Sequence, residues 1–285
     1  EIAGCASVLC RKKKNVPITK ALTDIVGTGG DGLGSFNISS MAALVAASCG
    51  VPIAKHGNRA VSSKSGSADF YEALGIKIDI PAEKTASIIE QTDFGFLFAP
   101  VYHSAMRFAA PVRKLLGVKT IMNLVGPLSN PAGAQYQMLG VYEKSLMLPV
   151  AEASKMLGSK RVMVISSDDG MDEISPAAKT AVIEIGEDGA MREYSIDPAD
   201  FGITGCLLDD LLGGDAAENV RLARELLAGT GKPGLRAAVA LNAAATMYIS
   251  GHAKTMKEGY ERSLAAIADG SVARKIEAVR EASCA

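Results

Sequence analysis

The stretch Asp24-Ile-Val-Gly-Thr-Gly-Gly-Asp-Gly-Leu-Gly-Ser-Phe-Asn-Ile-Ser-Ser40 joins a short apolar segment, a glycine-rich loop and the beginning of an apolar, helix-like run. Glycine lets backbone N–H groups approach a ligand with no Cβ in the way. The start of a helix adds N–H groups without partners and the positive end of a dipole. We therefore interpret residues 24–40 as a strand, a phosphate-binding loop and a helix N-terminus.

The spacing of these glycines differs from that of two widespread phosphate-binding motifs. The loop is not Gly-x-x-x-x-Gly-Lys-[Ser/Thr], which binds nucleoside triphosphates. It is also not a dinucleotide fingerprint, because no acidic strand end follows about twenty residues later. A generic kinase or dehydrogenase is therefore disfavoured, and a glycine-rich turn without a ligand remains an alternative for the loop alone.

A second polar stretch, Lys55-His-Gly-Asn-Arg-Ala-Val-Ser-Ser-Lys-Ser-Gly-Ser-Ala-Asp69, follows apolar residues 51–54. Its cations, amide and hydroxyls are donors that suit a polyanion. Two further motifs are Gly126-Pro-Leu-Ser-Asn-Pro-Ala132 and Gly170-Met-Asp-Glu-Ile-Ser175. The four motifs, in this order, resemble those of the anthranilate phosphoribosyltransferase family, and the resemblance runs from residue 1 to about residue 270.

Composition restricts the class of protein. The 285 residues can bury a large core, and 48% hydrophobic with 21% charged residues is ordinary for a globular protein. A net charge of -1 gives no bulk attraction to nucleic acid or to an anionic membrane, so we expect neither as a partner. The five scattered cysteines form no Cys-x-x-Cys pair, and no apolar run reaches the length of about 18 residues that spans a bilayer. Together with the lack of a signal-peptide core, this predicts a cytoplasmic location.

From Thr23 onward, short apolar strands alternate with helical patterns, which predicts an α/β fold with a mainly parallel sheet flanked by helices. The ligand should lie at the carboxyl ends of the strands, where the glycine loop and Lys55 fall. The predicted strands are residues 24–26, near 53, 96–99, 137–142, 161–166, 181–185 and 191–196, the last two as a hairpin. The predicted helices lie within 1–22 and at 40–49, 66–74, 82–90, 103–116 with a break at Pro111, 144–157, 216–227, 235–249 and 253–268.

The resemblance implies two domains. It assigns residues 1–22 and 104–128 to a small helical domain, and residues 23–103 and 129–285 to an α/β phosphoribosyltransferase domain. Family members carry further N-terminal helices before the point where this sequence begins, so we expect the small domain to be incomplete. Because that domain makes the family's dimer contact, we expect a homodimer when those helices are present.

The resemblance also implies a reaction. The 5-phosphoribosyl group would pass from phosphoribosyl pyrophosphate to the amine of anthranilate, giving N-(5-phosphoribosyl)anthranilate and pyrophosphate in tryptophan biosynthesis. Negative charge develops on the departing pyrophosphate, and the resemblance gives Lys55 the catalytic role of stabilising it. The residues that it implies for binding phosphoribosyl pyrophosphate are Gly27, Gly30, Asp31, Ser35, Asn37, Ile38, Ser39, Ser40, Lys55, His56, Gly57, Asn58, Arg59, Ala60, Val61, Ser62, Ser63 and Ser67.

Asp172 and Glu173 are adjacent carboxylates after a turn-prone segment, and hard oxygen ligands suit Mg²⁺ beside a diphosphate. Such a pair in a loop is more often solvated surface. The resemblance implies that Asp172, Glu173 and Ser39 are metal ligands, with Mg²⁺ as the cofactor. For Asp31 we expect a ribose hydroxyl or a magnesium-bound water as partner, the alternative being a turn-stabilising bond to local N–H groups.

The acceptor, anthranilate, is a flat aromatic amine with an adjacent carboxylate, which suits a guanidinium group. The resemblance implies that Arg113 binds this carboxylate and that Gly27 and Asn58 also line the acceptor pocket. The alternative for Arg113 is a solvent-facing helix residue. His103 is a weaker candidate, because Ser104 stands where the family commonly has Pro. An aryl amine has a free lone pair at neutral pH, so catalysis should rest on positioning and leaving-group stabilisation.

The sequence also allows two other classes of function, but each lacks a feature that it would need. A pyrimidine nucleoside phosphorylase shares the architecture and has a glycine loop, but it lacks the motif Lys55-His-Gly-Asn-Arg59 and takes phosphate as its acceptor. A non-enzymatic relative that binds nucleic acid would need a strongly basic surface, which the net charge of -1 disfavours. A salt titration of DNA binding separates that class from the enzymes.

Overall fold

The computed structural model describes residues 1–60, 63–109, 112, 115–116 and 118–285. Val61, Ser62 and Arg113, which the sequence assigns to the two substrates, lie outside the described residues. None of the helices in the described ranges has both the length and the apolar character needed to cross a membrane.

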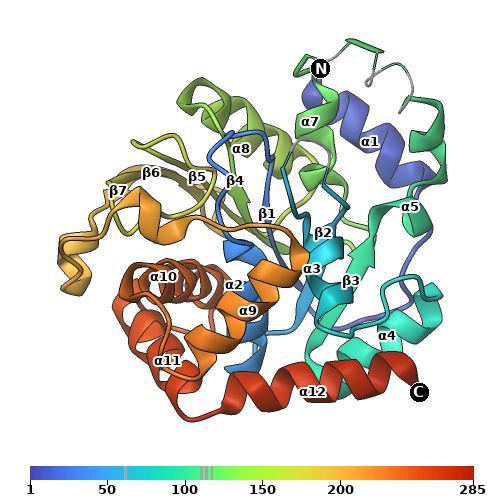
Figure 1. The fold of residues 1–285 in the computed structure, drawn as a ribbon. Coiled ribbons are helices and arrows are strands. Elements are labelled where there is room, and N and C mark those ends of the chain that lie inside the picture. Colours follow the sequence, from blue (N-terminus) through green and yellow to red (C-terminus); the bar gives the residue numbers. More distant parts are fainter. Residues whose placement is uncertain (61–62, 110–111, 113–114, 117) are drawn as a thin grey trace.

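Seven strands form one sheet, in the order β3-β2-β1-β4-β5-β6-β7 (Figure 1). Neighbours from β3 to β5 run parallel, and β6 and β7 extend the sheet as an antiparallel hairpin. The predicted mainly parallel α/β fold is therefore confirmed. The strands are β1 (Thr23–Gly27), β2 (Ile53–Gly57), β3 (Phe94–Phe98), β4 (Tyr136–Gly140), β5 (Arg161–Ser167), β6 (Thr180–Ile185) and β7 (Met191–Ile196).

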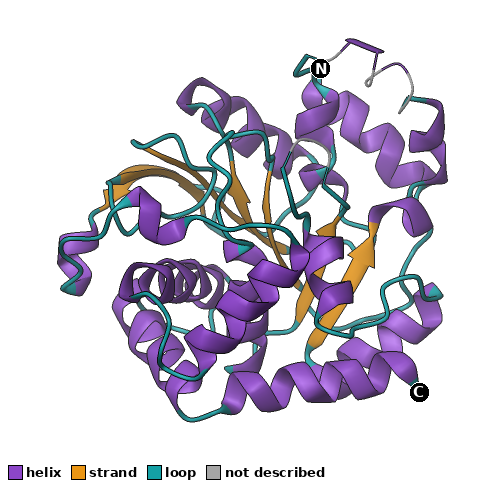
Figure 2. Cartoon of the chain, viewed as in Figure 1, coloured by secondary structure: helices purple, strands orange, loops and turns teal. Residues whose placement is uncertain are grey.

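Helices cover both faces of the sheet (Figure 2). On one face lie α2 (Ile38–Ser48), α3 (Ser67–Ala73), α9 (Ala216–Leu227), α10 (Pro233–Ile249), α11 (Met256–Ala268) and α12 (Ser271–Cys284). On the other lie α1 (Ile2–Lys12), α7 (Met122–Val125) and α8 (Met147–Met156), while α4 (Ala82–Thr92) and α5 (Ala99–Tyr102) pack beside the edge strand β3. The 3-10 helices are η1 (Ser104–Phe108), η2 (Pro127–Ser129), η3 (Lys144–Leu146), η4 (Pro198–Phe201) and η5 (Leu208–Leu211).

Alternation along the strands divides the core into two faces. In β4, Met138 packs in the cluster around α2 and α10, and its neighbour Leu139 packs in the cluster around α1 and α8. Side chains of a strand point alternately to opposite faces, so both faces need an apolar cover. Nearly all of α2 and α10 is buried, because each lies between the sheet and an outer helix, and this explains their nearly uniform apolar composition.

The structure corrects two of the predicted elements. The pattern predicts a helix over residues 103–116, but His103 has φ −117° and ψ 61°, which ends α5, and a 3-10 helix follows at Ser104–Phe108. Helix α12 was not predicted, although Val272, Ile276 and Val279 recur at the helical spacing i, i+4, i+7 and pack against the core. The division into two domains stays a prediction.

Candidate active site

The glycine loop connects β1 to α2, and α2 begins at Ile38, two residues earlier than predicted. Gly29, Gly30, Gly32 and Gly34 have φ between +66° and +81°, a range that other residues rarely adopt. The Gly29 N–H donates to Asp172 Oδ2 at 2.6 Å. The loop thus presents a backbone donor to a carboxylate that is 143 residues away in sequence.

Gly27 and Gly140 end the neighbouring strands β1 and β4, directly opposite each other. A Cβ at Gly27 would lie 2.3 Å from Asp172 Oδ2, and one at Gly140 would lie 1.6 Å from the Asp172 carbonyl oxygen. Both positions therefore need glycine so that Asp172 can reach the loop. Sequence reasoning missed Gly140, although a glycine at the end of a central strand is a recognisable signal of close backbone approach.

Asp172 and Glu173 are both buried, which contrasts with the solvated surface expected of such a pair. Glu173 Oε1 accepts from the Ser39 N–H, in the first turn of α2, at 3.1 Å. Burial raises the pKa of both carboxyls. The charge of Asp31 raises the pKa of Asp172 further, and the charge of Asp172 raises that of Glu173. The pair thus forms a concentrated, poorly solvated negative charge.

Lys55 lies in β2 with only 2% of its surface exposed. Its Nζ donates to the Ile25 carbonyl at 2.5 Å and to Ser39 Oγ at 3.4 Å. Burial lowers the pKa of Lys55, and the charges of Asp24, Glu173 and Asp172 oppose that effect. An ammonium group is thus held at the N-terminus of α2, within the field of the two carboxylates.

Asp24 and Asn130 form a buried link behind Lys55, and sequence reasoning missed it. Asp24 Oδ1 accepts from the His56 N–H at 3.1 Å, and its Oδ2 accepts from Asn130 Nδ2 at 2.7 Å. Asn130 Nδ2 also donates to the Ala54 carbonyl at 2.8 Å. Burial raises the pKa of Asp24 to about 6, although Lys55 and Asn130 lower it. The motif at residues 126–132 therefore braces β1 against β2.

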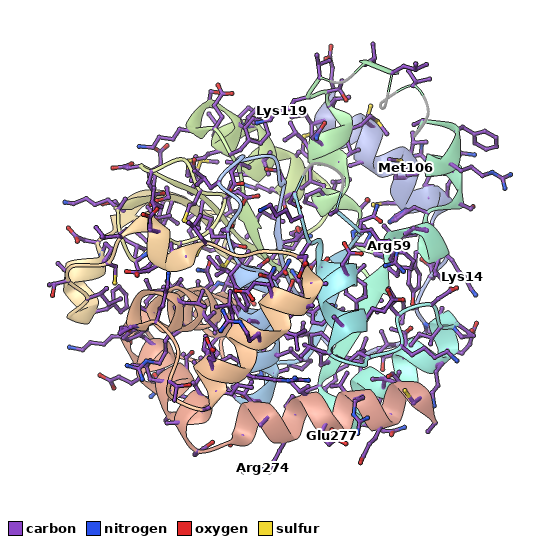
Figure 3. All side chains as sticks on the ribbon, viewed as in Figure 1. Lys14, Arg59, Met106, Lys119, Arg274 and Glu277 are labelled. Atoms are coloured by element: carbon purple, nitrogen blue, oxygen red, sulfur yellow. The ribbon has the colours of Figure 1, made fainter. Side chains whose placement is uncertain are left out.

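Much of the segment from Asn58 to Ser67 is engaged by its own neighbours. Arg59, labelled in Figure 3, pairs with Asp69 at 3.0 Å and with Glu72 at 2.8 Å. Asp69 Oδ2 also accepts from the Ala60 N–H at 2.9 Å. Further bonds run from Arg59 N to Asn58 Oδ1, from Ser63 Oγ to Ser65 O and from Ser67 Oγ to Asn58 O, and Gly57 lies against Ser67 Oγ. Arg59 thus faces carboxylates in this structure.

The other residues predicted to bind phosphoribosyl pyrophosphate lie in the glycine loop and in the first turn of α2. Ile38 and Ser40 are buried in α2, and the Ser40 carbonyl accepts from the Tyr71 hydroxyl at 2.9 Å. Ser35 pairs with Leu212 in an isolated antiparallel bridge. Leu33 N donates to Asp31 Oδ1 at 3.3 Å, the turn-stabilising bond that was the alternative for this residue. Gly30 lies beside the Lys119 side chain.

Two buried histidines lie beside this site. The His56 and His103 rings are 5.0 Å apart between centroids, and the Nε2 atom of each has no hydrogen-bond partner among the described residues. Burial, followed by the neighbouring His103, lowers the pKa of His56 to about 3. Burial also lowers the pKa of His103. Both rings are therefore neutral at pH 7 and retain an unused ring nitrogen.

Comparison with known proteins connects this geometry to a family. A model described as glycosyl transferase family, a/b domain, matches residues 19–273. The anthranilate phosphoribosyltransferase of Desulfatibacillum aliphaticivorans is 46% identical over 280 residues, which cover 98% of this chain and 82% of that protein. This chain belongs to the anthranilate phosphoribosyltransferase family. The resemblance seen in the four motifs is thereby confirmed.

Solved structures of anthranilate phosphoribosyltransferases share the fold. The crystal structure of the Thermus thermophilus enzyme has a TM-score of 0.93 and 43% identity, covering 100% of this chain and 84% of that one. The Saccharomyces cerevisiae enzyme in complex with PRPP and Mg has a TM-score of 0.89 and 29% identity, covering 99% of this chain and 79% of that one. The glycine loop and the carboxylate pair therefore lie in a scaffold shared with enzymes of this name.

Proposed function

We propose that this chain transfers the 5-phosphoribosyl group of phosphoribosyl pyrophosphate to the amine of anthranilate. One observation carries the proposal. A glycine loop, a helix N-terminus, a buried lysine and two buried carboxylates converge at the carboxyl ends of β1 and β2. Backbone N–H groups and the Lys55 ammonium suit the phosphates of phosphoribosyl pyrophosphate. The two carboxylates suit a metal ion bound to those phosphates.

The backbone N–H groups of Gly29 and Ser39, together with Lys55, can bind the diphosphate of phosphoribosyl pyrophosphate. The Gly29 and Ser39 N–H groups now donate to Asp172 and Glu173, and we infer that phosphate oxygens take these donors when phosphoribosyl pyrophosphate binds. Lys55 can reach the same place from β2, because its Nζ already contacts Ser39 Oγ. The rest of the predicted donor set, including Val61 and Ser62, stays part of the proposal.

The carboxylate pair fits Mg²⁺. The described residues contain no group of three or more His, Cys, Asp or Glu side chains able to hold a metal ion. Mg²⁺ commonly needs only one or two carboxylates, the remaining ligands being phosphates and water. Burial raises the pKa of both carboxyls, Asp31 raises that of Asp172 further and Asp172 raises that of Glu173, so a cation would relieve an unfavourable concentration of charge. We propose Asp172, Glu173 and Ser39 as its ligands. The structure of the yeast relative in complex with PRPP and Mg supports Mg²⁺ as the cation.

The chain's own groups position the substrates and stabilise the leaving group in the chemical step. The anthranilate nitrogen forms a bond to C1 of the ribose while the bond from C1 to the pyrophosphate oxygen breaks, and the nitrogen then loses a proton to solvent. Lys55 and the backbone donors stabilise the charge on the departing pyrophosphate. When bound, Mg²⁺ supplies further charge neutralisation on the same group. The aryl amine has a free lone pair, so positioning replaces general-base catalysis.

Anthranilate is proposed to lie between Gly27, Asn58 and Arg113, with the neutral His56 and His103 rings nearby. A structure of the yeast relative is in complex with 4-fluoroanthranilate, which supports an acceptor of this shape. We also propose a homodimer through the region of α1 and residues 104–118, which carries exposed apolar side chains. These are Val8, Phe108, Val112, Leu115, Leu116 and Val118. All five cysteines are free, in keeping with the proposed cytoplasmic location.

The test is a direct assay. Mixing the protein with phosphoribosyl pyrophosphate, anthranilate and Mg²⁺ should remove anthranilate fluorescence at a rate that saturates with each substrate, and chelation of the metal should stop the reaction. Phosphorolysis of uridine, or DNA binding that weakens steeply with salt, would instead indicate a nucleoside phosphorylase or a nucleic-acid-binding relative. A protein that leaves anthranilate unchanged while folded and supplied with metal would overturn the proposal.

A further inference from the structure

A segment more than 170 residues along the chain from the glycine loop is bonded to it through the backbone. The Phe36 N–H donates to the Leu211 carbonyl at 2.8 Å, and the Gly213 N–H donates to the Gly34 carbonyl at 3.0 Å. These two bonds hold both sides of Ser35, which itself pairs with Leu212. We call residues 211–214 the clamp segment. It joins the end of the glycine loop to the start of α9.

Asn219, in the first turns of α9, ties the clamp segment to the N-terminus of α2. Its side chain is buried, with 1% of the residue exposed. Asn219 Oδ1 accepts from the Gly214 N–H at 2.8 Å, and Asn219 Nδ2 donates to Asn37 Oδ1 at 2.7 Å. Asn37 is the residue immediately before α2. A single amide therefore links the clamp segment to the helix whose N-terminus binds Glu173.

The chain of bonds continues to the second polar stretch. Asn37 Oδ1 also accepts from Ser65 Oγ at 3.1 Å, and Asn37 Nδ2 donates to the Ser65 carbonyl at 3.2 Å. Three of the four hydrogen bonds that the Asn37 amide can make are thus already made within the protein. These bonds make the Asn37 side chain a structural link between α9 and the Ser65 turn, and the contact with phosphoribosyl pyrophosphate that the resemblance implies for Asn37 stays a prediction.

Close packing around Asn219 leaves little room for other arrangements. A Cβ at Gly213 would lie 2.7 Å from Asn219 Oδ1 and 2.7 Å from Phe36 Cα. The clamp segment therefore packs this closely against the loop only with glycine at position 213. Because interiors are densely packed, removing the amide should let the loop, the clamp segment and the Ser65 turn shift relative to one another.

We propose that Asn219 is a positioning residue for phosphoribosyl pyrophosphate, acting through Gly214 and Asn37 on the glycine loop, the α2 N-terminus and the Ser65 turn together. The inference rests on the proposed function, since it concerns the donor side of that site. Asn219 touches neither the reacting atoms nor the acceptor pocket. Loss of the Asn219 amide should therefore raise the KM for phosphoribosyl pyrophosphate and leave the KM for anthranilate nearly unchanged.

The experiment compares three variants in the anthranilate fluorescence assay, with each substrate varied in turn. Asn219→Ala removes both hydrogen bonds, and Asn219→Asp keeps the acceptor for Gly214 but places a carboxylate oxygen against Asn37 Oδ1. Asp215→Ala is the matched control, because it removes the cap of the same helix, where Asp215 Oδ1 accepts from the Glu218 N–H at 2.9 Å, and leaves Asn219 in place. Melting temperatures report the stability of each variant.

Both Asn219 variants should raise the KM for phosphoribosyl pyrophosphate about tenfold, the effect of one to two hydrogen bonds, and leave the KM for anthranilate within about twofold. Asp215→Ala should lower the melting temperature without this split. Asn219 would be shown only to stabilise α9 by either of two results. One is an equal change in the KM values for both substrates, and the other is the same rise in the KM for phosphoribosyl pyrophosphate in Asp215→Ala. If Asn219→Ala fails to fold, the nearly isosteric Asn219→Asp decides the question. An inactive wild-type protein would overturn the proposed function instead, so the two failures are distinguishable.

Discussion

Asn130→Ala tests the buried link between Asp24 and β2. The Asn130 amide donates to Asp24 Oδ2 and to the Ala54 carbonyl, and without it the carboxylate keeps only backbone donors from His56 and Ile25. Losing a hydrogen bond to a charged group costs about 1.5–3 kcal/mol of unfolding free energy, against about 1 kcal/mol for a neutral pair. The stability penalty of the variant should therefore depend on whether Asp24 is ionised.

Burial raises the pKa of Asp24 from its ordinary 3.8 to about 6, and the Asn130 hydrogen bond opposes that rise. A carboxyl whose pKa is raised on folding contributes stability that is fully present below its unfolded pKa and is lost as the pH rises through its folded pKa. For Asp24 this loss falls between about pH 4 and pH 6. Without Asn130 the folded pKa rises further, so the loss of stability continues to higher pH in the variant. The penalty should be about 0.5–2 kcal/mol larger at pH 8 than at pH 5.

Urea unfolding of the wild type and of Asn130→Ala at pH 5 and pH 8 measures this difference directly. Ser154→Ala is the control, because it breaks buried hydrogen bonds to Gln137 and Ser159 in which both partners are uncharged. Its penalty should be the same at both pH values. An equal penalty for Asn130→Ala at pH 5 and pH 8 would refute the reasoning, since Asp24 would then not change its charge across that range.

Three further predictions concern the active site. Gly140→Ala forces a Cβ toward the Asp172 carbonyl, so turnover and the response of the rate to Mg²⁺ should both fall sharply; a normal magnesium titration would contradict the close packing of β4 on Asp172. Asp172→Asn combined with Glu173→Gln should nearly abolish turnover while the melting temperature stays level or rises, because two buried like charges are removed; retained turnover would remove the metal role. Arg113→Ala should weaken anthranilate binding by about 1.5–3 kcal/mol, or roughly 10- to 150-fold in KM, whereas Lys55→Ala should weaken the donor and slow the chemical step. If Arg113→Ala instead raised the KM for phosphoribosyl pyrophosphate and left that for anthranilate unchanged, the proposed place of the acceptor pocket relative to the glycine loop would be wrong.

The elements that the sequence predicted well carry local signals. The apolar run before Gly27, the glycines after it and the alanine-rich patterns of α2 and α10 each depend on neighbours in the chain. The break at His103 could not be predicted in the same way. It depends on the backbone angles of one residue after a four-residue helix, which no periodicity reports.

The site was predictable as a set of motifs but not as a geometry. Asp24 and Asn130 are 106 residues apart, and Asn37 and Asn219 are 182 apart, so no local pattern indicates either contact. Both depend on which elements become neighbours in the fold. The burial of Asp172 and Glu173 has the same origin, because it arises only once β1 and β4 lie side by side and both end in glycine.

That adjacency also explains how the chain can bury two neighbouring carboxylates. Burying a charge is costly unless it is paired or hydrogen-bonded. In this structure the donors are the Gly29 and Ser39 N–H groups, and Lys55 supplies the nearby positive charge. These are the same groups that we propose for the diphosphate. Binding of the donor substrate would therefore exchange partners, with phosphate oxygens taking the N–H groups while the metal takes the carboxylates. Phosphate entry alone would leave the two buried carboxylates without their N–H donors, and metal entry alone would leave those N–H groups without an acceptor, so the phosphates and the metal should enter the site together.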